Sequence, residues 1–309
     1  MTKEDDIRTQ VAETYARAVR AGGGCCGGER QTKGVVARIA GYSDAELEAL
    51  PADAVQNSFG CGDPVSFSDV RPGEVVLDLG CGAGIDLLLA AQRVGPGGRV
   101  IGVDMTDEMI VRARANAAAA GQENIEVRKG FIEALPVADG SVDLVISNCV
   151  LNLSPDKPAA FAEIARVLKP GGRMRVSDLV VDDLPQWVRE SAILYSSCVA
   201  GAISEEEYVG GLRAAGLERV DVVQRLVYDK AMLGGLIASE VEAGGEALVA
   251  EAAAVLSDGA GGCGCGCSPT PPPGLATLGT PERDDLLERA VEALEGKVAS
   301  VLVTAVRAA

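Results

Sequence analysis

The segment V-V-L-D-L-G-C-G-A-G at residues 75–84 constrains the fold of this chain more than any other stretch. Its first half is a short apolar run of the kind that forms a strand buried on both faces. Three glycines follow, and residues 85–94 then carry apolar and small residues at helical spacing. Glycines at a strand-to-helix turn let the backbone approach a ligand closely, and a helix N-terminus favours negative charge. The segment therefore predicts an α/β fold with a ligand at this turn, although a fold that binds no nucleotide stays open.

A second apolar run, Arg99–Val103, ends at Asp104 about twenty residues further on, where a carboxylate suits a ribose diol. The glycine pattern is D-x-G-x-G-x-G, whereas the dinucleotide fingerprint is G-x-G-x-x-G. The pattern resembles motif I of the class I S-adenosylmethionine (SAM) methyltransferases. That resemblance implies a Rossmann-like fold, with Asp104 on the ribose of SAM and these residues around the rest of it: Asp78, Gly80, Gly82 and Gly84.

Apolar strands and helices continue to alternate beyond Asp104. The spacing predicts helices at 107–120 and 157–168 and strands at 125–130, 142–147 and 173–179. Such alternation favours a doubly wound, mostly parallel sheet, in which ligands lie outside the carboxyl ends of the strands. Ile132, Glu133, Asn148 and Cys149 all follow such ends.

The flanking segments predict additions to this core. Helices are expected at 4–19, 187–200, 205–215 and 281–295, with capping boxes at Ser43/Glu46 and Ser204/Glu207. Strands are expected at 220–228 and at 298–306, the latter returning to the main sheet. The expected organisation is an N-terminal segment (1–60), a methyltransferase domain (61–180) and a C-terminal substrate-binding portion (181–309). The last contains a flexible, low-complexity insertion at 258–280, rich in Gly, Cys and Pro.

The amino-acid composition limits which classes of partner the chain is expected to bind. The net charge of −17 argues against a nucleic-acid partner, because such binding relies on clustered Lys and Arg. No apolar run is long enough to span a membrane, and the N-terminus lacks a signal-peptide core, so we expect a cytoplasmic protein and a small-molecule substrate. The chain has no histidine, which removes both an imidazole base and a histidine metal ligand.

The cysteine residues are the more informative candidates for functional groups. The chain has nine cysteines, which in a reducing compartment are expected to be thiols for catalysis or metal binding. Cys61 lies between two glycines, outside any apolar run. Cys25 and Cys26 lie in a glycine-rich stretch, for which a flexible linker is an equal alternative. Cys263, Cys265 and Cys267 alternate with glycine; they could capture a thiophilic ion or simply belong to a linker.

Five motifs in order resemble the bacterial arsenite methyltransferases: S-F-G-C-G-D-P, L-D-L-G-C-G-A-G, F-I-E-A-L-P, S-N-C-V-L-N-L-S-P-D-K and Y-S-S-C-V-A-G-A. The resemblance spans roughly residues 55–225 and includes the closing strand. It implies that Cys149 and Cys198 hold As(III) and that Cys61 is a third thiol, which also forms a disulfide after methyl transfer. Cys25 or Cys26 would match a further N-terminal cysteine, and Cys81 reads as a small packing residue.

The same resemblance implies Ile132 and Glu133 beside the adenine of SAM and Asn148 near its methionine. Arsenite or methylated trivalent arsenicals would be substrates, and thioredoxin or glutathione would restore the thiols. The chemistry agrees, because the arsenic lone pair can attack a sulfonium methyl without a general base. Two rivals remain: a SAM methyltransferase of a quinone, sterol or small carboxylate, in which Cys149 and Cys198 are ordinary buried cysteines, and a thiol-rich sequestration protein without catalysis.

Overall fold

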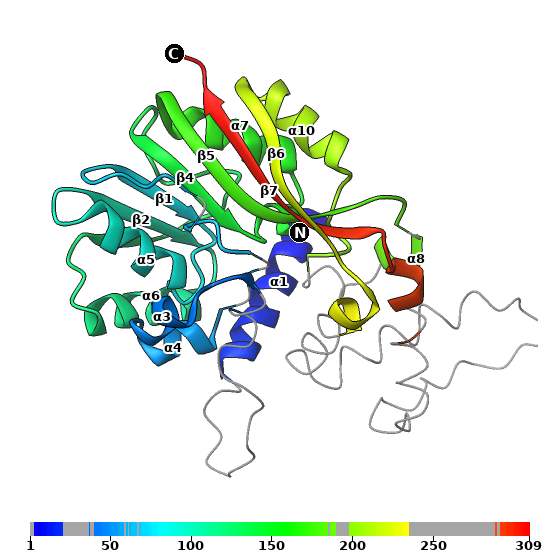
Figure 1. Cartoon of the computed structure of the whole chain (residues 1–309), viewed down its shortest axis with the longest axis horizontal. Coiled ribbons are helices and arrows are strands. Elements are labelled where there is room, and N and C mark those ends of the chain that lie inside the picture. Colours follow the sequence, from blue (N-terminus) through cyan, green and yellow to red (C-terminus); the bar gives the residue numbers. More distant parts are fainter. Residues whose placement is uncertain are drawn as a thin grey trace, which may run out of the picture.

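The computed structural model describes residues 3–20, 37, 40–58, 60, 62–66, 68–184, 186–189, 198–234, 288 and 291–309. Its centre is a seven-stranded sheet in the order β3-β2-β1-β4-β5-β7-β6 (Figure 1). The strands are β1 (Val75–Leu79), β2 (Arg99–Asp104), β3 (Ile125–Lys129), β4 (Val142–Asn148), β5 (Leu168–Val181), β6 (Leu217–Val227) and β7 (Val298–Arg307). The first five are parallel, while β7 runs antiparallel between β5 and β6.

Helices cover both faces of this sheet. On one face lie α3 (Asp44–Glu48), α4 (Ala52–Gln56), α5 (Ile85–Val94) and α6 (Asp107–Ala119); on the other lie α7 (Lys157–Val167) and α10 (Glu205–Ala214). Neighbouring residues of β1 point to opposite layers: Leu77 packs with the α7 side and Val76 with the α5 side. The predicted doubly wound, mostly parallel sheet is therefore confirmed, as is the return of the closing strand.

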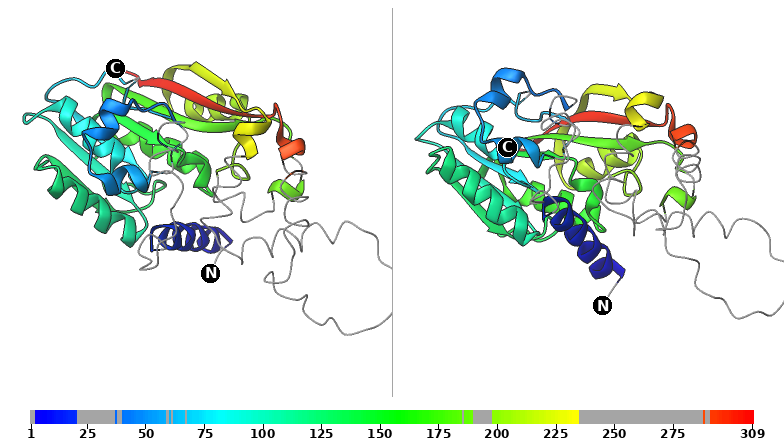
Figure 2. Two further views of the ribbon diagram at one scale, coloured as in Figure 1. Left: turned by 60° about the horizontal axis from the view of Figure 1, so that its bottom comes forward. Right: turned by 90° about the horizontal axis from the view of Figure 1, so that it is seen from below.

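Chain order reverses beside β1, which pairs with β2 on one side and β4 on the other. In open α/β sheets a crevice forms at this reversal, outside the carboxyl ends of the strands. Helix α1 (Lys3–Arg20) lies at that edge of the sheet (Figures 1 and 2). The local signals for α3 and α10 are confirmed, since Ser43 and Ser204 form capping boxes with Glu46 and Glu207.

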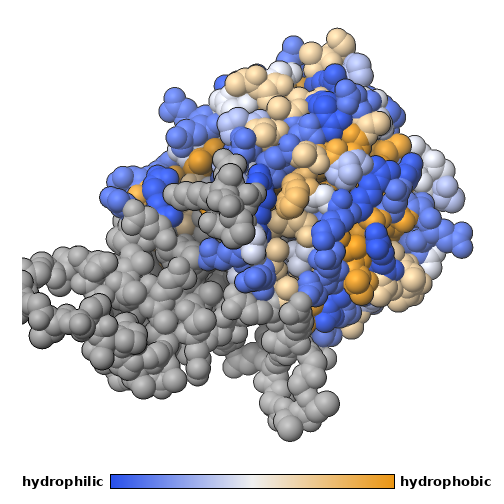
Figure 3. All heavy atoms as spheres, turned by 180° about the vertical axis from the view of Figure 1, so that it is seen from behind, coloured by the Kyte–Doolittle hydropathy of each residue, from blue (hydrophilic) through white to orange (hydrophobic). Residues whose placement is uncertain are grey.

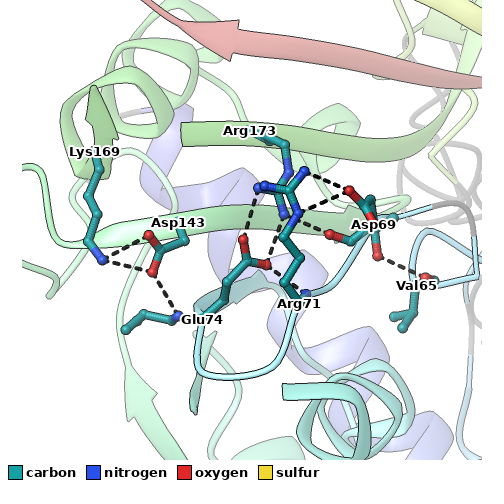
Figure 4. Close-up of polar contacts among 9 residues, drawn as sticks. Val65, Asp69, Arg71, Glu74, Asp143, Lys169 and Arg173 are labelled. Atoms are coloured by element: carbon teal, nitrogen blue, oxygen red, sulfur yellow. Dashed lines mark hydrogen bonds and ion pairs between the residues drawn. The ribbon is translucent and has the colours of Figure 1, made fainter. Parts of the chain in front are cut away.

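The opposite edge of the sheet is fastened by ion pairs (Figure 4). Arg173 of β5 donates to both carboxylate oxygens of Glu74, at 2.9 and 2.8 Å, just before β1 begins. Lys169 donates to both oxygens of Asp143 at 2.8 Å, and Asp143 also accepts the Val75 N–H at 2.9 Å. These contacts fix the amino ends of β1, β4 and β5 relative to one another, away from the crevice.

Two sequence expectations differ from the structure. The helix predicted at 187–200 is wrong at its C-terminal end: α8 covers Gln186–Arg189, and Cys198–Ala200 form a turn. The reason is the backbone of Cys198, whose φ of 63° is left-handed and cannot continue a right-handed helix. Strand β5 also begins at Leu168 rather than 173, because Leu168 is extended and pairs with Val142.

The predicted insertion at 258–280 lies outside the described residues, as do Cys25, Cys26, Cys61, Cys263, Cys265 and Cys267. Seen from behind, the described part of the surface interleaves hydrophilic side chains with apolar ones (Figure 3). Within the described ranges, no helix combines the length and the apolar character needed to cross a membrane.

Candidate functional site

The glycine-rich turn joins β1 to α5 as the sequence predicts. Gly80, Gly82 and Gly84 have φ values of 64°, 52° and 95°, a region that residues with a Cβ rarely adopt. A Cβ on Gly80 would also lie 2.4 Å from the Val150 side chain. The turn is therefore available only to glycine, and it leaves backbone N–H groups at the carboxyl end of β1.

Asp104 organises this turn from the end of β2. Its carboxylate accepts the Gly82 N–H at 2.9 Å and the Thr106 N–H at 2.8 Å. Burial raises the pKa of Asp104, while the backbone donors oppose that shift by favouring the carboxylate. The side chain that the sequence assigns to a ribose thus also fixes the loop beside it.

A cavity opens at this edge and encloses about 960 Å³ of empty space, its open mouth included. Of the residues predicted to bind the cofactor, all but Asp78 and Gly84 line it. The lining includes Gly80, Gly82, Asp104, Ile132, Glu133 and Asn148, together with Cys149. Helix α1 contributes Arg8, Val11 and Tyr15. The size suits a nucleoside-containing ligand.

The contribution of α1 is absent from the sequence prediction. Arg8 forms an ion pair with Glu133 at 3.3 Å, and its guanidinium carbon lies 5.5 Å from the centre of the Phe131 ring. Glu133 also accepts the Ser154 hydroxyl at 2.7 Å. Helical periodicity predicts α1 itself, but nothing local in the sequence indicates a partner 125 residues away.

Buried carboxylates gather around the glycine-rich turn, on one side of the cavity. Asp86, in the first turn of α5, is 4% exposed and accepts the Tyr42 hydroxyl at 2.8 Å. Burial raises its pKa to about 7, against the lowering effect of the Tyr42 hydrogen bond. Burial also raises the pKa of Asp78 well above its usual value, and nearby Asp86 and Asp104 add to that shift. Such a cluster favours a cationic ligand, whose charge would stabilise the ionised carboxylates.

Asn148 connects this cluster to the loop that carries Cys61. Its amide accepts the Gly62 N–H at 3.1 Å and donates to the Gly62 carbonyl at 2.6 Å and to the Tyr42 hydroxyl at 3.0 Å. A Cβ on Gly60 would lie 2.2 Å from the Asn148 amide, and one on Gly62 would lie 1.9 Å from Ser177. Both glycines that flank Cys61 are therefore required by close packing against Asn148 and Ser177.

The structure brings Cys149 and Cys198 into contact although 49 residues separate them. The Cys198 thiol donates to the Cys149 carbonyl at 2.7 Å, and the two residues are 3% and 6% exposed respectively. Both have left-handed backbones, with φ of 58° for Cys149 and 63° for Cys198. Each such conformation costs about 1–3 kcal/mol for a residue with a side chain, a strain that concentrates at functional sites.

The surroundings of the two cysteines differ from the cofactor side. They belong to an apolar cluster with residues from β5, β7 and the C-terminal portion, including Leu179, Val199 and Leu294. Burial raises the pKa of Tyr228 to about 12, and the neighbouring Cys198 adds to this effect. The Cys149 sulfur is engaged in a disulfide bond, so this thiol has to be reduced before it can bind a soft ion.

Cys81 plays a different part. It packs against α5 and β2 within the core, and burial raises the pKa of its thiol well above the usual value. A thiol in that state is a poor nucleophile, which agrees with the packing role expected from the sequence. Within the described ranges, no cluster of three or more His, Cys, Asp or Glu side chains could hold a metal ion.

Known proteins resemble this chain in sequence. Residues 71–216 match the family model described as a methyltransferase domain. The chain is 44% identical over 236 residues to an arsenite methyltransferase of Halobacterium salinarum, covering 72% of this chain and 60% of that protein. It is 43% identical over 153 residues to an arsenite methyltransferase of Aquipseudomonas alcaligenes, of which it spans 44%. The chain thus spans about half the length of these curated relatives.

Solved structures resemble this chain in fold. The crystal structure of an arsenic(III) S-adenosylmethionine methyltransferase from Chlamydomonas reinhardtii matches with 37% identity and a TM-score of 0.56, covering 63% of this chain and 68% of that one. More distant solved structures share the fold alone, such as that of the YcgJ protein from Bacillus subtilis, at 21% identity and a TM-score of 0.55. The glycine-rich turn, the cavity and these relatives agree, and the chain belongs to the arsenite methyltransferase family of class I SAM-dependent methyltransferases.

Proposed function

We propose that this chain transfers methyl groups from SAM to As(III) held by Cys61, Cys149 and Cys198. One observation carries the proposal: Cys149 lines the cofactor cavity, and the Cys198 thiol lies 2.7 Å from its carbonyl oxygen. A pair of thiols beside a methyl-donor site is what methylation of a soft, thiol-bound atom requires. Arsenite and methylated trivalent arsenicals are the proposed substrates.

The residues around the cavity fit SAM. The Asp78 carboxyl oxygen Oδ2 is buried and has no hydrogen-bond partner among the described residues, and a cation bound in the neighbouring cavity would stabilise the ionised form of this group. Asp104 would bind the ribose, Ile132 and Glu133 would border the adenine, and the turn at Gly80–Gly84 would pass close to the methionine. Asn148 would act beside that methionine mainly by holding Gly62, because its amide is already bonded there.

When bound, SAM supplies an electrophilic sulfonium methyl group, which the lone pair of trivalent arsenic can attack without a general base. The thiols of this chain would hold arsenic at a fixed distance and direction, and alignment of this kind can lower a barrier by roughly 7–11 kcal/mol. The apolar cluster around Cys198 would exclude water from the arsenic. On this proposal the portion at 181–309 supplies much of the arsenic side of the site.

Cys61 is proposed as the third thiol because of its neighbours. Gly60 and Gly62 both lie against the side chain of Asn148, the residue that precedes Cys149. These two glycines are the chain neighbours of Cys61, and their packing against the residue before Cys149 supports the assignment. Inorganic arsenite, with three exchangeable valences, would use all three thiols.

A thiol reductant, thioredoxin or glutathione, would complete the cycle. The disulfide at Cys149 supports this part of the proposal, because two electrons and two protons are needed to return it to a thiol that can bind arsenic.

Arsenic speciation after incubation of the reduced protein with SAM, a thiol and arsenite tests the proposal. We expect methylated arsenic and an equivalent amount of S-adenosylhomocysteine from the wild type, and neither from the Cys198→Ser variant. Arsenite binding without SAM binding would favour sequestration. SAM binding without arsenite binding would favour another small-molecule substrate, and either result would overturn the assignment.

A further inference from the structure

The loop that follows β4 is fastened to β5 at three points. The Cys149 N–H donates to the Ser177 carbonyl at 2.8 Å. Three residues later, the Asn152 amide donates to the Asp178 carboxylate at 2.7 Å and to the Leu179 carbonyl at 2.6 Å. Three successive residues of β5 therefore hold both ends of the four-residue loop at 149–152. The first residue of this loop is Cys149, which has the left-handed backbone described above.

Asn152 and Asp178 have no role in the proposed chemistry, yet both are fully buried at 0% exposure. Asp178 also accepts its neighbour's N–H, from Leu179, at 2.9 Å and the Tyr208 hydroxyl of α10 at 3.2 Å. A buried carboxylate is costly unless its oxygens are bonded, and here three donors from three directions satisfy it. One of those donors comes from the Cys149 loop and one from a helix on the outer face.

The other side of the loop meets a cation. Lys157, at the start of α7, donates through Nζ to the carbonyls of Asn152 at 3.2 Å and Ser154 at 3.1 Å. Its charge interacts with that of Asp178 and with Cys198. The short helical turn η2 (Leu151–Leu153) thus lies between the buried Asp178 carboxyl group and the half-buried Lys157 ammonium group.

We infer that Asn152 and Asp178 are positioning residues, which hold Cys149 in its left-handed conformation with its carbonyl toward the Cys198 thiol. Strained backbone persists only where its surroundings over-determine it. The contacts at Asn152 are the nearest side-chain contacts after Cys149 that could do so from within the loop. The inference rests on the proposed function, since its consequence is that Cys198 and Cys149, once the Cys149 disulfide is reduced, are set for arsenic before arsenic arrives.

A pair of variants tests this role. Asn152→Ala removes the loop's own hold on Asp178 and Leu179. The matched control, Tyr208→Phe, removes a hydrogen bond to the same carboxylate from the α10 side and leaves the loop contacts in place. Each removes a buried hydrogen bond to Asp178, so a purely structural role would lower the stability of both variants without lowering arsenite affinity in one alone.

Three measurements are made on the reduced proteins: arsenite affinity by equilibrium dialysis, SAM affinity by calorimetry, and hydrogen exchange of the Leu153 and Ser154 amides, which close η2. We expect Asn152→Ala to bind arsenite about tenfold more weakly, about 1.4 kcal/mol, with faster exchange in this loop. SAM affinity should stay within twofold of the wild type. Tyr208→Phe should match the wild type in all three.

Unchanged arsenite affinity and unchanged exchange in Asn152→Ala would overturn the inference, as would equal losses in Tyr208→Phe. A wild type that binds no arsenite would refute the proposed function instead. The exchange data would still decide whether Asn152 holds the Cys149 loop.

Discussion

We expect Asp86 to make SAM binding dependent on pH near neutrality, because of the groups that surround its carboxyl. The groups that face it are Tyr42, Asn148, Asp63, Asp78 and, at longer range, Arg93. Burial is the largest influence and raises the pKa of Asp86 to about 7, so the carboxyl is about half protonated at neutral pH in the absence of a ligand. A cationic ligand binds better to the carboxylate than to the neutral acid, because only the carboxylate has a charge to attract it.

Because of that preference, the affinity for SAM should rise as pH rises. If SAM requires the carboxylate, its affinity is proportional to the ionised fraction, which rises from about 9% at pH 6 to about 76% at pH 7.5 for a pKa near 7. The expected gain is about eightfold, or about 1.2 kcal/mol, with release of up to one proton. Folding stability without SAM changes the opposite way: the folded protein keeps a proton that the unfolded chain loses near pH 4, so this carboxyl lowers stability as pH rises from about 4 to 7.

Calorimetry at pH 6, 6.5, 7 and 7.5, in buffers of different ionisation enthalpy, measures both the affinity and the protons released. Asp86→Asn retains an acceptor for Tyr42 but cannot ionise, so its SAM affinity should be weaker and nearly independent of pH. Asp143→Asn removes a carboxylate at the opposite edge of the sheet and should keep the wild-type slope. A wild-type affinity that is constant over this range, or an equal slope in Asp86→Asn, would refute the reasoning.

Three further predictions concern the cofactor and the thiols. Asp104→Ala removes the acceptor of two loop N–H groups as well as the ribose acid, so calorimetry should show SAM binding at least about tenfold weaker and denaturant melts should show about 1–3 kcal/mol less stability. Cys149→Ser and Cys198→Ser should abolish methylation of arsenite while SAM affinity stays unchanged, because a hydroxyl is a hard donor; full turnover in either would contradict the site. Replacing the three cysteines at 263–267 by serine should lower the rate only at low arsenite concentration, and a fall in the maximal rate would place them in the catalytic site.

The sequence is sufficient to predict features that depend on neighbouring residues. The strand, glycine turn and helix at 75–94 are specified by alternation, by the absence of Cβ atoms and by helical spacing, and the structure has each of them. Both capping boxes are equally local, since the two partners lie three positions apart in the chain. The closing strand could be expected from its β-branched run, although its position between β5 and β6 depends on the whole sheet.

Contacts between distant segments could not be predicted from one sequence. Tyr42 reaches Asp86 over 44 residues and Asn148 over 106, and no local pattern distinguishes a tyrosine that supports a cofactor site from one in the core. Cys198 illustrates the converse problem. Its surroundings have helical spacing, but the tertiary contact with Cys149 requires a left-handed residue, and that contact overrides the local preference.

The carboxyl edge of the sheet is divided into two electrostatically different halves, and the division suits the proposed reaction. Over β1 and β2 lie Asp78, Asp86 and Asp104, all buried, which favour a cationic methyl donor and lose part of that attraction once the donor has become neutral S-adenosylhomocysteine. Over β4 and β5 lie the two cysteines in an apolar cluster, where a neutral arsenic–thiolate adduct costs little to bury. A reaction driven by the arsenic lone pair needs no proton acceptor between these halves, and a chain without a single histidine supplies none of the usual kind. Charge would therefore select the donor, and sulfur the acceptor.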